Sequence, residues 1–181
     1  ALGYVSEIGK QRDFYSHYVR PLAGKNSRAF VVISDALRYE VAAELCDTIT
    51  RTTKGTAKLE AVQAVFPSIT KFGMASLLPG RKLSVNDDME VLVDEMPTRS
   101  TDERGKILRA ANINSVAVQY TDVLNMKRAE RRELVSGKEV VYIYHNTIDA
   151  IGDKAPTEKK VFEACEDAMQ ELSNILRIVI N

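Results

Sequence analysis

The chain has 181 residues, and its 25 Lys and Arg balance its 25 Asp and Glu, so the formal net charge is zero. This length suits one domain with a real core, and the 45% of hydrophobic residues excludes a disordered chain. Zero net charge argues against a general nucleic-acid clamp, although it leaves room for a local basic patch. No stretch approaches the ~18 apolar residues of a membrane span, and no segment resembles a signal peptide.

Apolar residues at helical spacing, and short β-rich runs between them, predict a regular order of elements. In chain order the pattern predicts a helix over 3–20, a strand over 30–34, a helix over 36–50, a strand over 59–65, a short helix over 70–78, a hairpin over 83–93, a helix over 101–111, a strand over 115–118, a helix over 122–134, a strand over 140–144, a loop over 146–156 and a helix over 157–180. Because strands alternate with helices, we expect an α/β fold with a mainly parallel sheet flanked by helices.

The chain contains two cysteines, Cys46 and Cys165. Both lie in helical patterns with apolar neighbours, which favours buried free thiols over a disulfide or a pair of metal ligands. Free thiols favour a cytoplasmic protein. Since the sequence stops at Asn181 inside an apolar helical pattern, we also expect it to be part of something longer.

The first candidate functional residue is Asp35, which follows the apolar run Phe30–Ile33 and precedes a helical pattern. A carboxylate at the carboxyl end of a buried strand lies at the sheet edge where α/β proteins hold ligands, and it could bind a divalent metal. The alternative is an N-cap, because Asp before an amphipathic helix satisfies free backbone amides.

The second candidate is Thr70, the last residue of the sequence PSIT at 67–70. It would stand at a helix N-terminus, where backbone N–H groups attract phosphate. A hydroxyl beside a metal has a lowered pKa and becomes a nucleophile. The alternative is that Ser68 or Thr70 only caps the helix.

The third candidate is the segment HNTIDAIGD at 145–153. Its His145, Asp149 and Asp153 recur at four-residue steps, so they could converge on a metal ion from a loop or share one face of a helix. The alternative is a polar loop in which the two acids form turns. A P-loop is not an option, because Gly24-Lys25 is followed by Asn26 and precedes its strand.

Taken in order, the three segments resemble the PglZ family, in particular its type-A branch, from bacterial BREX and phage-growth-limitation defence systems. The resemblance lies in VVISDALRYEVAAEL, FPSITKFGMASLLPG and VVYIYHNTIDAIGD, and it covers residues 28–181. Residues 1–27 would then be an N-terminal helix and link, and 28–181 a partial alkaline phosphatase-like domain.

The resemblance implies a member of the alkaline phosphatase superfamily, with a two-metal site and a Thr nucleophile. Asp35 matches the first metal aspartate, Thr70 the nucleophile, and Asp149 a ligand of the other metal, with His145 as ligand or orienting residue. Asp153 stands where the family pattern has histidine. A carboxylate in place of imidazole favours Mg²⁺ or Mn²⁺ over Zn²⁺, so the divalent metal stays open among the three.

The resemblance further implies a metal-dependent phosphatase or phosphodiesterase whose partners are other BREX proteins, such as the methyltransferase component, with DNA left open. The later D-H-G element of the superfamily has no counterpart in the sequence. We therefore expect the isolated piece to be weak or inactive. The alternative function is a non-catalytic interaction module of the defence complex.

Overall fold

The computed structural model describes residues 7–24, 26–152 and 158–180. It divides the chain into two compact units that interleave in sequence. We call the first the sheet unit, made of Ala1–Ile33 and Ala61–Tyr144. The second, made of Ser34–Glu60 and His145–Asn181, we call the helical unit.

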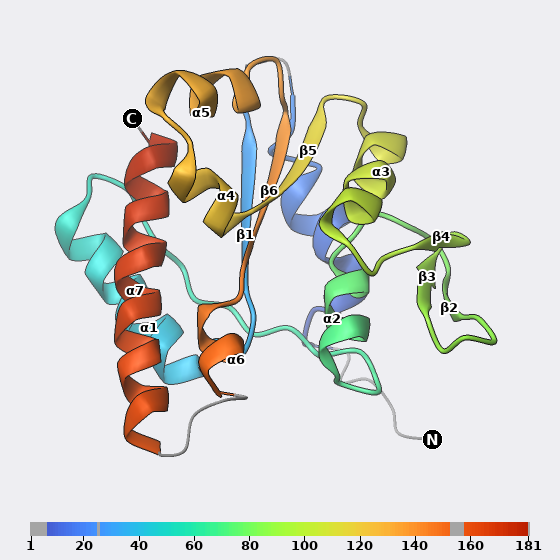
Figure 1. Ribbon diagram of the computed structural model, residues 1–181, viewed down its shortest axis with the longest axis horizontal. Helices are drawn as coiled ribbons and strands as arrows, with labels where there is room; N and C mark the ends of the chain where they lie inside the picture. Colours follow the sequence, from blue (N-terminus) through green and yellow to red (C-terminus); the bar gives the residue numbers. More distant parts are fainter. Residues whose placement is uncertain (1–6, 25, 153–157, 181) are drawn as a thin grey trace. The chain divides into compact units, whose positions relative to one another are not determined.

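The main sheet has three strands in the order β1-β6-β5 (Figure 1). These strands are β1 (Ala29–Ser34), β6 (Val140–His145) and β5 (Ser115–Gln119). Strands β5 and β6 are parallel. Strand β1 also runs parallel to β6. The Ala29 N–H donates to the Glu139 carbonyl at one end, and the Asp35 N–H donates to the His145 carbonyl at the other, so residue numbers rise in the same direction along both strands. Every residue of the central strand β6 is buried, as expected for a parallel strand covered on both faces.

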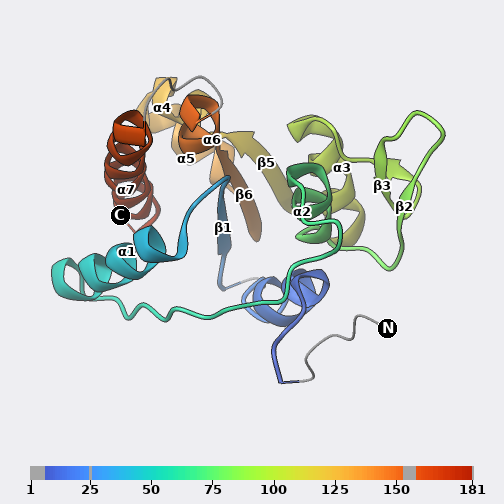
Figure 2. The same ribbon diagram turned by 90° about the horizontal axis from the view of Figure 1, so that it is seen from below.

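Helices of the sheet unit pack against this sheet and confirm the predicted α/β class. Helix α3 (Thr101–Ala111) lies against β5, and α2 (Thr70–Ser76) lies on the same side of the sheet (Figures 1 and 2). The predicted bounds of α3 are confirmed. It begins at a capping box in which the Ser100 hydroxyl accepts the Glu103 N–H and the Glu103 carboxylate accepts the Ser100 N–H.

A second, antiparallel sheet contains β2 (Leu83–Val85), β3 (Val91–Val93) and β4 (Met96–Pro97). The predicted hairpin is confirmed as β2 and β3. The sequence did not predict β4, which follows a two-residue turn in which Asp94 and Glu95 both have positive φ, 46° and 70°.

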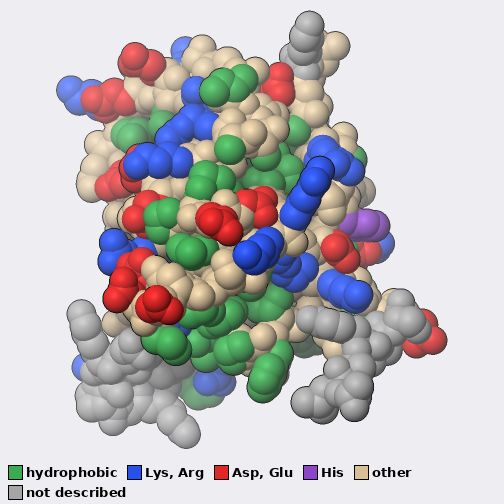
Figure 3. Space-filling view, turned by 90° about the vertical axis from the view of Figure 1, so that its right-hand side faces the viewer, with side chains coloured by type: hydrophobic (Ala, Val, Ile, Leu, Met, Phe, Trp, Pro, Cys, Tyr) green, Lys and Arg blue, Asp and Glu red, His purple; other side chains and the backbone are tan. Residues whose placement is uncertain are grey.

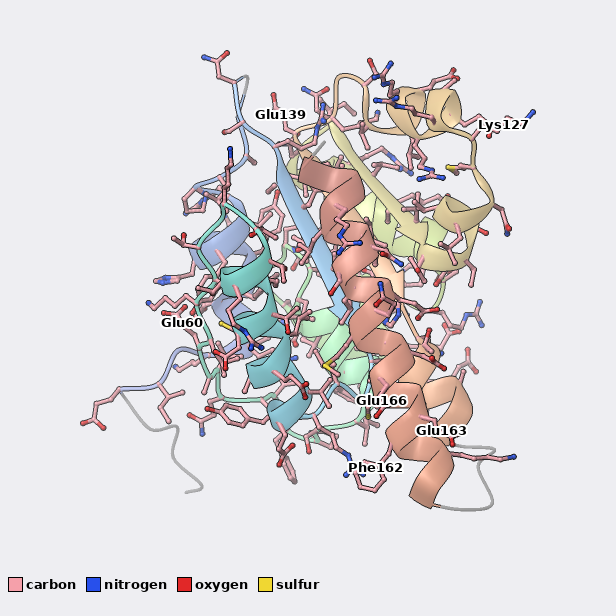
Figure 4. All side chains as sticks on the ribbon, turned by 90° about the vertical axis from the view of Figure 1, so that its left-hand side faces the viewer. Glu60, Lys127, Glu139, Phe162, Glu163 and Glu166 are labelled. Atoms are coloured by element: carbon pink, nitrogen blue, oxygen red, sulfur yellow. The ribbon has the colours of Figure 1, made fainter. Side chains whose placement is uncertain are left out.

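The helical unit contains α1 (Tyr39–Thr52), α6 (Thr147–Gly152) and α7 (Glu158–Ile180). Helices α1 and α7 lie side by side (Figure 4). Their core is small: buried Ile148, Cys165 and Ala168 pack against two half-buried side chains near the start of α1. Both cysteines of the chain are free thiols, as predicted.

Two predictions in the first half of the chain need correction. The helix predicted over 3–20 is, in its described part, helical only over 11–19, as a 3₁₀ turn, η1 (Gln11–Asp13), followed by a π-helical segment, η2 (Tyr15–Val19). The predicted strand over 59–65 does not form. Its apolar and polar residues do alternate. Among the described residues, however, its only β-type pairing is a single bridge between Gln63 and Lys10, and one bridge does not make a sheet.

Two predictions in the second half are also wrong. The helix expected over 122–134 is two helices, α4 (Tyr120–Asn125) and α5 (Arg128–Val135), because the backbone at Met126 is extended. The loop expected from 146 begins with the six-residue helix α6. In the described part of the chain, no helix combines the length and the apolar character that crossing a membrane requires.

Candidate functional site

Asp35 lies at the carboxyl end of β1, as predicted, and its side chain is half-buried. Its N–H donates to the carbonyl of His145 (2.9 Å), and its Oδ1 accepts the N–H of Ala36 (3.1 Å). The helix begins later, at Tyr39, and its N-cap is Arg38 without a side-chain cap bond. The capping alternative for Asp35 is therefore wrong.

The turn after Asp35 is held in an unfavourable backbone conformation. Ala36 has φ of 60°, in the left-handed region. The left-handed conformation costs a residue with a Cβ roughly 1–2 kcal/mol of conformational free energy. Such residues persist where the surrounding structure over-determines them, and they cluster at functional sites. The strain at Ala36 therefore supports a functional role for this corner, independently of the carboxylate.

His145 is at the centre of a buried hydrogen-bond network in the helical unit. Its Nδ1 lies 2.9 Å from the Ser34 hydroxyl, and its Nε2 lies 2.7 Å from Oε2 of Glu171. The Thr147 hydroxyl donates to the same Glu171 oxygen (2.6 Å). A carboxylate only accepts, so Nε2 carries a proton, and in the neutral ring Nδ1 accepts from Ser34. Because both ring nitrogens are engaged, this imidazole fits an orienting role better than a metal ligand.

Reasoning from the sequence missed Glu171, although the sequence does contain a signal for it. The buried face of α7 repeats at Ala164, Ala168 and Ile175. Glu171 falls at the helical step between Ala168 and Ile175, so it is an acid at a position where the pattern otherwise has apolar residues. A carboxylate on such a face needs a buried polar partner, and that partner is His145.

Asp149 lies in the first turn of α6 and is half-buried. Ile148 beside it is anchored in the core of the helical unit, which fixes the helix that carries Asp149. Asp153 lies outside the described residues. Among the residues that are described, no group of three or more His, Cys, Asp or Glu is arranged to hold a metal ion. These residues alone therefore do not make a complete metal site.

Thr70 lies in the sheet unit, at the first residue of α2, and is exposed. The N-cap of α2 is Ile69, which has no side-chain cap bond. The alternative that Ser68 or Thr70 caps this helix is therefore wrong, and the Thr70 hydroxyl is not used for capping.

A cleft of about 700 Å³ in the sheet unit is lined by Thr70. We call it the Thr70 cleft. Three cationic side chains also line it, from Lys71, Arg99 and Arg104, together with two acids, Asp88 and Glu90. A volume of this size suits a small-molecule ligand.

The cations of the Thr70 cleft are held in place by neighbouring groups. The Arg104 Nε donates to the carbonyl of Thr98 (2.7 Å), and its guanidinium lies over the ring of Tyr144, 4.7 Å from the centroid. Burial raises the pKa of Tyr144 to about 12, so its hydroxyl stays neutral next to Arg104. Lys71 Nζ donates to the carbonyl of Met89 (3.1 Å) and retains two further N–H donors.

The predicted site residues thus fall in both units. Asp35 and His145 are joined by a backbone hydrogen bond within the helical unit, and Asp149 belongs to that unit too. Thr70 belongs to the sheet unit.

A parallel sheet flanked by helices is the architecture expected of an alkaline phosphatase-like domain. The family model described as the BREX system PglZ alkaline phosphatase-like domain matches residues 14–181, and the chain belongs to this family.

Two curated relatives are similar over nearly the whole chain. The alkaline phosphatase-like protein PglZ of Bacillus cereus (strain H3081.97) is 42% identical over 177 residues, which cover 98% of this chain and 21% of the relative. The alkaline phosphatase-like protein BrxZ of Escherichia coli O9:H4 (strain HS) is 43% identical over 179 residues, covering 96% and 20%. The chain therefore spans about a fifth of the length of these relatives. No solved structure matches it.

Proposed function

We propose that this chain supplies the nucleophile, Thr70, to a metal-dependent phosphatase or phosphodiesterase of a bacterial BREX phage-defence system. The observation that carries this proposal is the Thr70 cleft. An exposed hydroxyl that caps no helix shares a concave, ligand-sized space with Lys71, Arg99 and Arg104. Membership of the PglZ family supports the same reaction class.

The reaction would proceed through a covalent intermediate. The Thr70 Oγ1 forms a bond to phosphorus, the bond from phosphorus to the leaving alcohol oxygen breaks, and the Thr70 proton passes to that oxygen. Water then cleaves the phosphothreonine, which restores the hydroxyl and releases the phosphoryl group as phosphate or, from a diester, as a phosphate monoester. Arg99, Arg104 and Lys71 would bind the non-bridging oxygens and offset their negative charge, which is the main requirement in phosphoryl transfer.

We assign Asp35 and Asp149 as carboxylate ligands of a divalent metal, Mg²⁺, Mn²⁺ or Zn²⁺. Since the described residues include no complete ligand group, further ligands, Asp153 among them, must come from outside these residues. His145 is assigned as the residue that orients the Asp35 corner, because its ring nitrogens are engaged by Ser34 and Glu171.

Two variants at one position test the nucleophile. Thr70→Ser keeps a hydroxyl and Thr70→Ala removes it, so kcat on an aryl phosphate or a bis-aryl phosphate should fall at least 100-fold in Thr70→Ala and far less in Thr70→Ser. The assay uses the intact protein with added Mn²⁺, Mg²⁺ or Zn²⁺. Equal kcat values for Thr70→Ala and the unmodified protein would exclude Thr70.

The second candidate is a non-catalytic interaction module of the defence complex. It is favoured by the lack of a metal-holding group of three or more ligands in the described part of the chain. Metal titration separates the two functions. A ligand at 100 times its Kd stabilises the folded state by about 2.7 kcal/mol, so Mn²⁺ should raise Tm, and Asp35→Ala with Asp149→Ala should abolish the rise. An unchanged Tm in every metal supports the module.

For partners we propose other BREX proteins, with the methyltransferase component as the first to test. Co-purification of the intact protein with that component would support this assignment. DNA is the alternative partner, and salt-sensitive retention of the protein on duplex DNA would support it.

A further inference from the structure

A second cleft of the sheet unit gathers arginines. It has a volume of about 530 Å³, and it shares no lining residue with the Thr70 cleft. Its three cationic side chains come from separate segments: Arg12 from η1, Arg20 from the end of η2 and Arg81 from the loop after α2. We call it the arginine cleft. On the face of the molecule seen in Figure 3, Lys and Arg side chains are interspersed with Asp and Glu side chains.

The positive charge of the arginine cleft is only partly offset by its walls, because Asp94, which interacts electrostatically with Arg12 and Arg81, carries one negative charge against three positive charges. Among the described residues, no ion pair joins Arg12, Arg20 or Arg81 to an acid, and the only acid lining the cleft is Asp94. The Asp94 carboxylate already accepts the backbone N–H groups of Arg81 and Lys82, at 3.1 and 2.8 Å. The three guanidinium groups repel one another, and the Asp94 carboxylate is already engaged in hydrogen bonds. An anion bound between the guanidinium groups would offset this electrostatic repulsion.

The Arg12 side chain and the backbone that carries Arg81 are pre-organised. The Arg12 Nη2 donates to the carbonyl of Arg81 (3.0 Å). The loop that carries Arg81 is pressed against β3 at Gly80, where a Cβ would lie 2.2 Å from Cγ1 of Val93. Only glycine fits there, and the Asp94 carboxylate fixes the next two backbone amides. A site that is already ordered loses little conformational entropy when a ligand binds.

The side chains of Arg20 and Arg81 are exposed, and neither makes a hydrogen bond or ion pair with a described residue. Neutral donors complete the wall, since Ser16 and Asn112 also line the cleft. Apolar side chains such as Leu78 and Ile107 lie beside them. The lining therefore combines fork-shaped cationic donors with an apolar surface.

We propose that the arginine cleft binds a small phosphorylated ligand, with a phosphate or pyrophosphate group on Arg12, Arg20 and Arg81 and an organic part on the apolar wall. Guanidinium forks match phosphate oxygens in bidentate geometry. The cleft volume lies within the range of small-molecule sites. This site is separate from the proposed catalytic cleft, so ligand binding here does not depend on Thr70.

Calorimetric titration of the intact protein with pyrophosphate and with ATP tests this assignment. We expect both to bind, and the double variant Arg20→Ala/Arg81→Ala to raise Kd at least tenfold. The control is Arg132→Ala, which removes one positive charge, as Arg20→Ala alone does, from an exposed position of α5 outside both clefts. It should leave Kd within twofold, as should Thr70→Ala.

Other outcomes overturn the proposal. These are no heat of binding for either ligand, equal Kd values for the Arg20/Arg81 double variant and Arg132→Ala, or a loss of binding in Arg99→Ala of the same size. Retention of duplex DNA that depends on Arg20 and Arg81, without pyrophosphate binding, would assign the cleft to nucleic acid instead. If Arg81→Ala prevents folding, the Kd values of Arg20→Ala test the proposal instead, because the Arg20 side chain makes no hydrogen bond or ion pair with another described residue.

Discussion

The Nε2 of His145 lies 2.7 Å from the Oε2 of Glu171, and this contact joins the end of β6 to the middle of α7. His145 is 1% exposed. The same carboxylate oxygen accepts the Thr147 hydroxyl, and the other ring nitrogen contacts Ser34. One acid therefore ties α6, α7 and the strand end next to Asp35 into a single network.

Removing Glu171 should destabilise the helical unit. In Glu171→Ala the buried His145 N–H and the Thr147 hydroxyl lose their acceptor, and an unsatisfied buried polar group costs about 1–3 kcal/mol. Urea unfolding measures the loss. The control is Glu166→Ala on the same helix, at an exposed position (Figure 4). Equal free energies of unfolding for the two variants would show that the network contributes nothing.

Glycine at position 36 should stabilise the corner after Asp35. Ala36 has φ of 60°, and Ala36→Gly relieves a strain of roughly 1–2 kcal/mol, partly offset by about 0.4–1 kcal/mol of added unfolded-state entropy. We expect a small rise in the free energy of unfolding. The control Ala42→Gly, inside α1, should lower it by about 1 kcal/mol. A loss of similar size in both variants would contradict left-handed strain at Ala36.

The Asp94 carboxylate should make stability depend on pH. Hydrogen bonds from the backbone N–H groups of Lys82 and then Arg81 lower the pKa of Asp94 below its ordinary value of 3.8. A lowered folded-state pKa means that its stabilisation is present above the unfolded-state pKa and is lost as pH falls through the folded-state pKa. The Tm difference between the unmodified protein and Asp94→Asn should therefore be largest at neutral pH. It should shrink below pH 3.8, and a constant difference would contradict this.

The sequence predicted the three strands of the main sheet because buried strands appear as short apolar runs in the sequence. Parallel strands covered on both faces are continuous apolar runs, and β6 is buried throughout. The segment 59–65 alternates apolar and polar residues, yet it forms no strand, because strand formation needs a neighbour that no local pattern supplies. The extended backbone at Met126 and the short helix α6 were also not predicted from the sequence.

The candidate site was predictable only where chemistry coincides with a strand end or a helix start. Asp35 and Thr70 meet that condition, and both capping alternatives for them failed. Glu171 does not, because it meets His145 across 26 residues of sequence. The arginine cleft brings Arg12 and Arg81 together from segments that no motif connects. Contacts between segments that are far apart in the sequence depend on the fold, so the spacing of residues along the chain does not predict them.

Identification of the phosphorylated residue tests most directly whether Thr70 is the nucleophile. The intact protein is mixed with a ³²P-labelled phosphate ester, quenched with acid and digested, and the labelled peptide is sequenced. We predict a phosphothreonine at Thr70 that is absent from Thr70→Ala. Label on any other residue, or turnover that continues in Thr70→Ala, would contradict the assignment of Thr70 as the nucleophile.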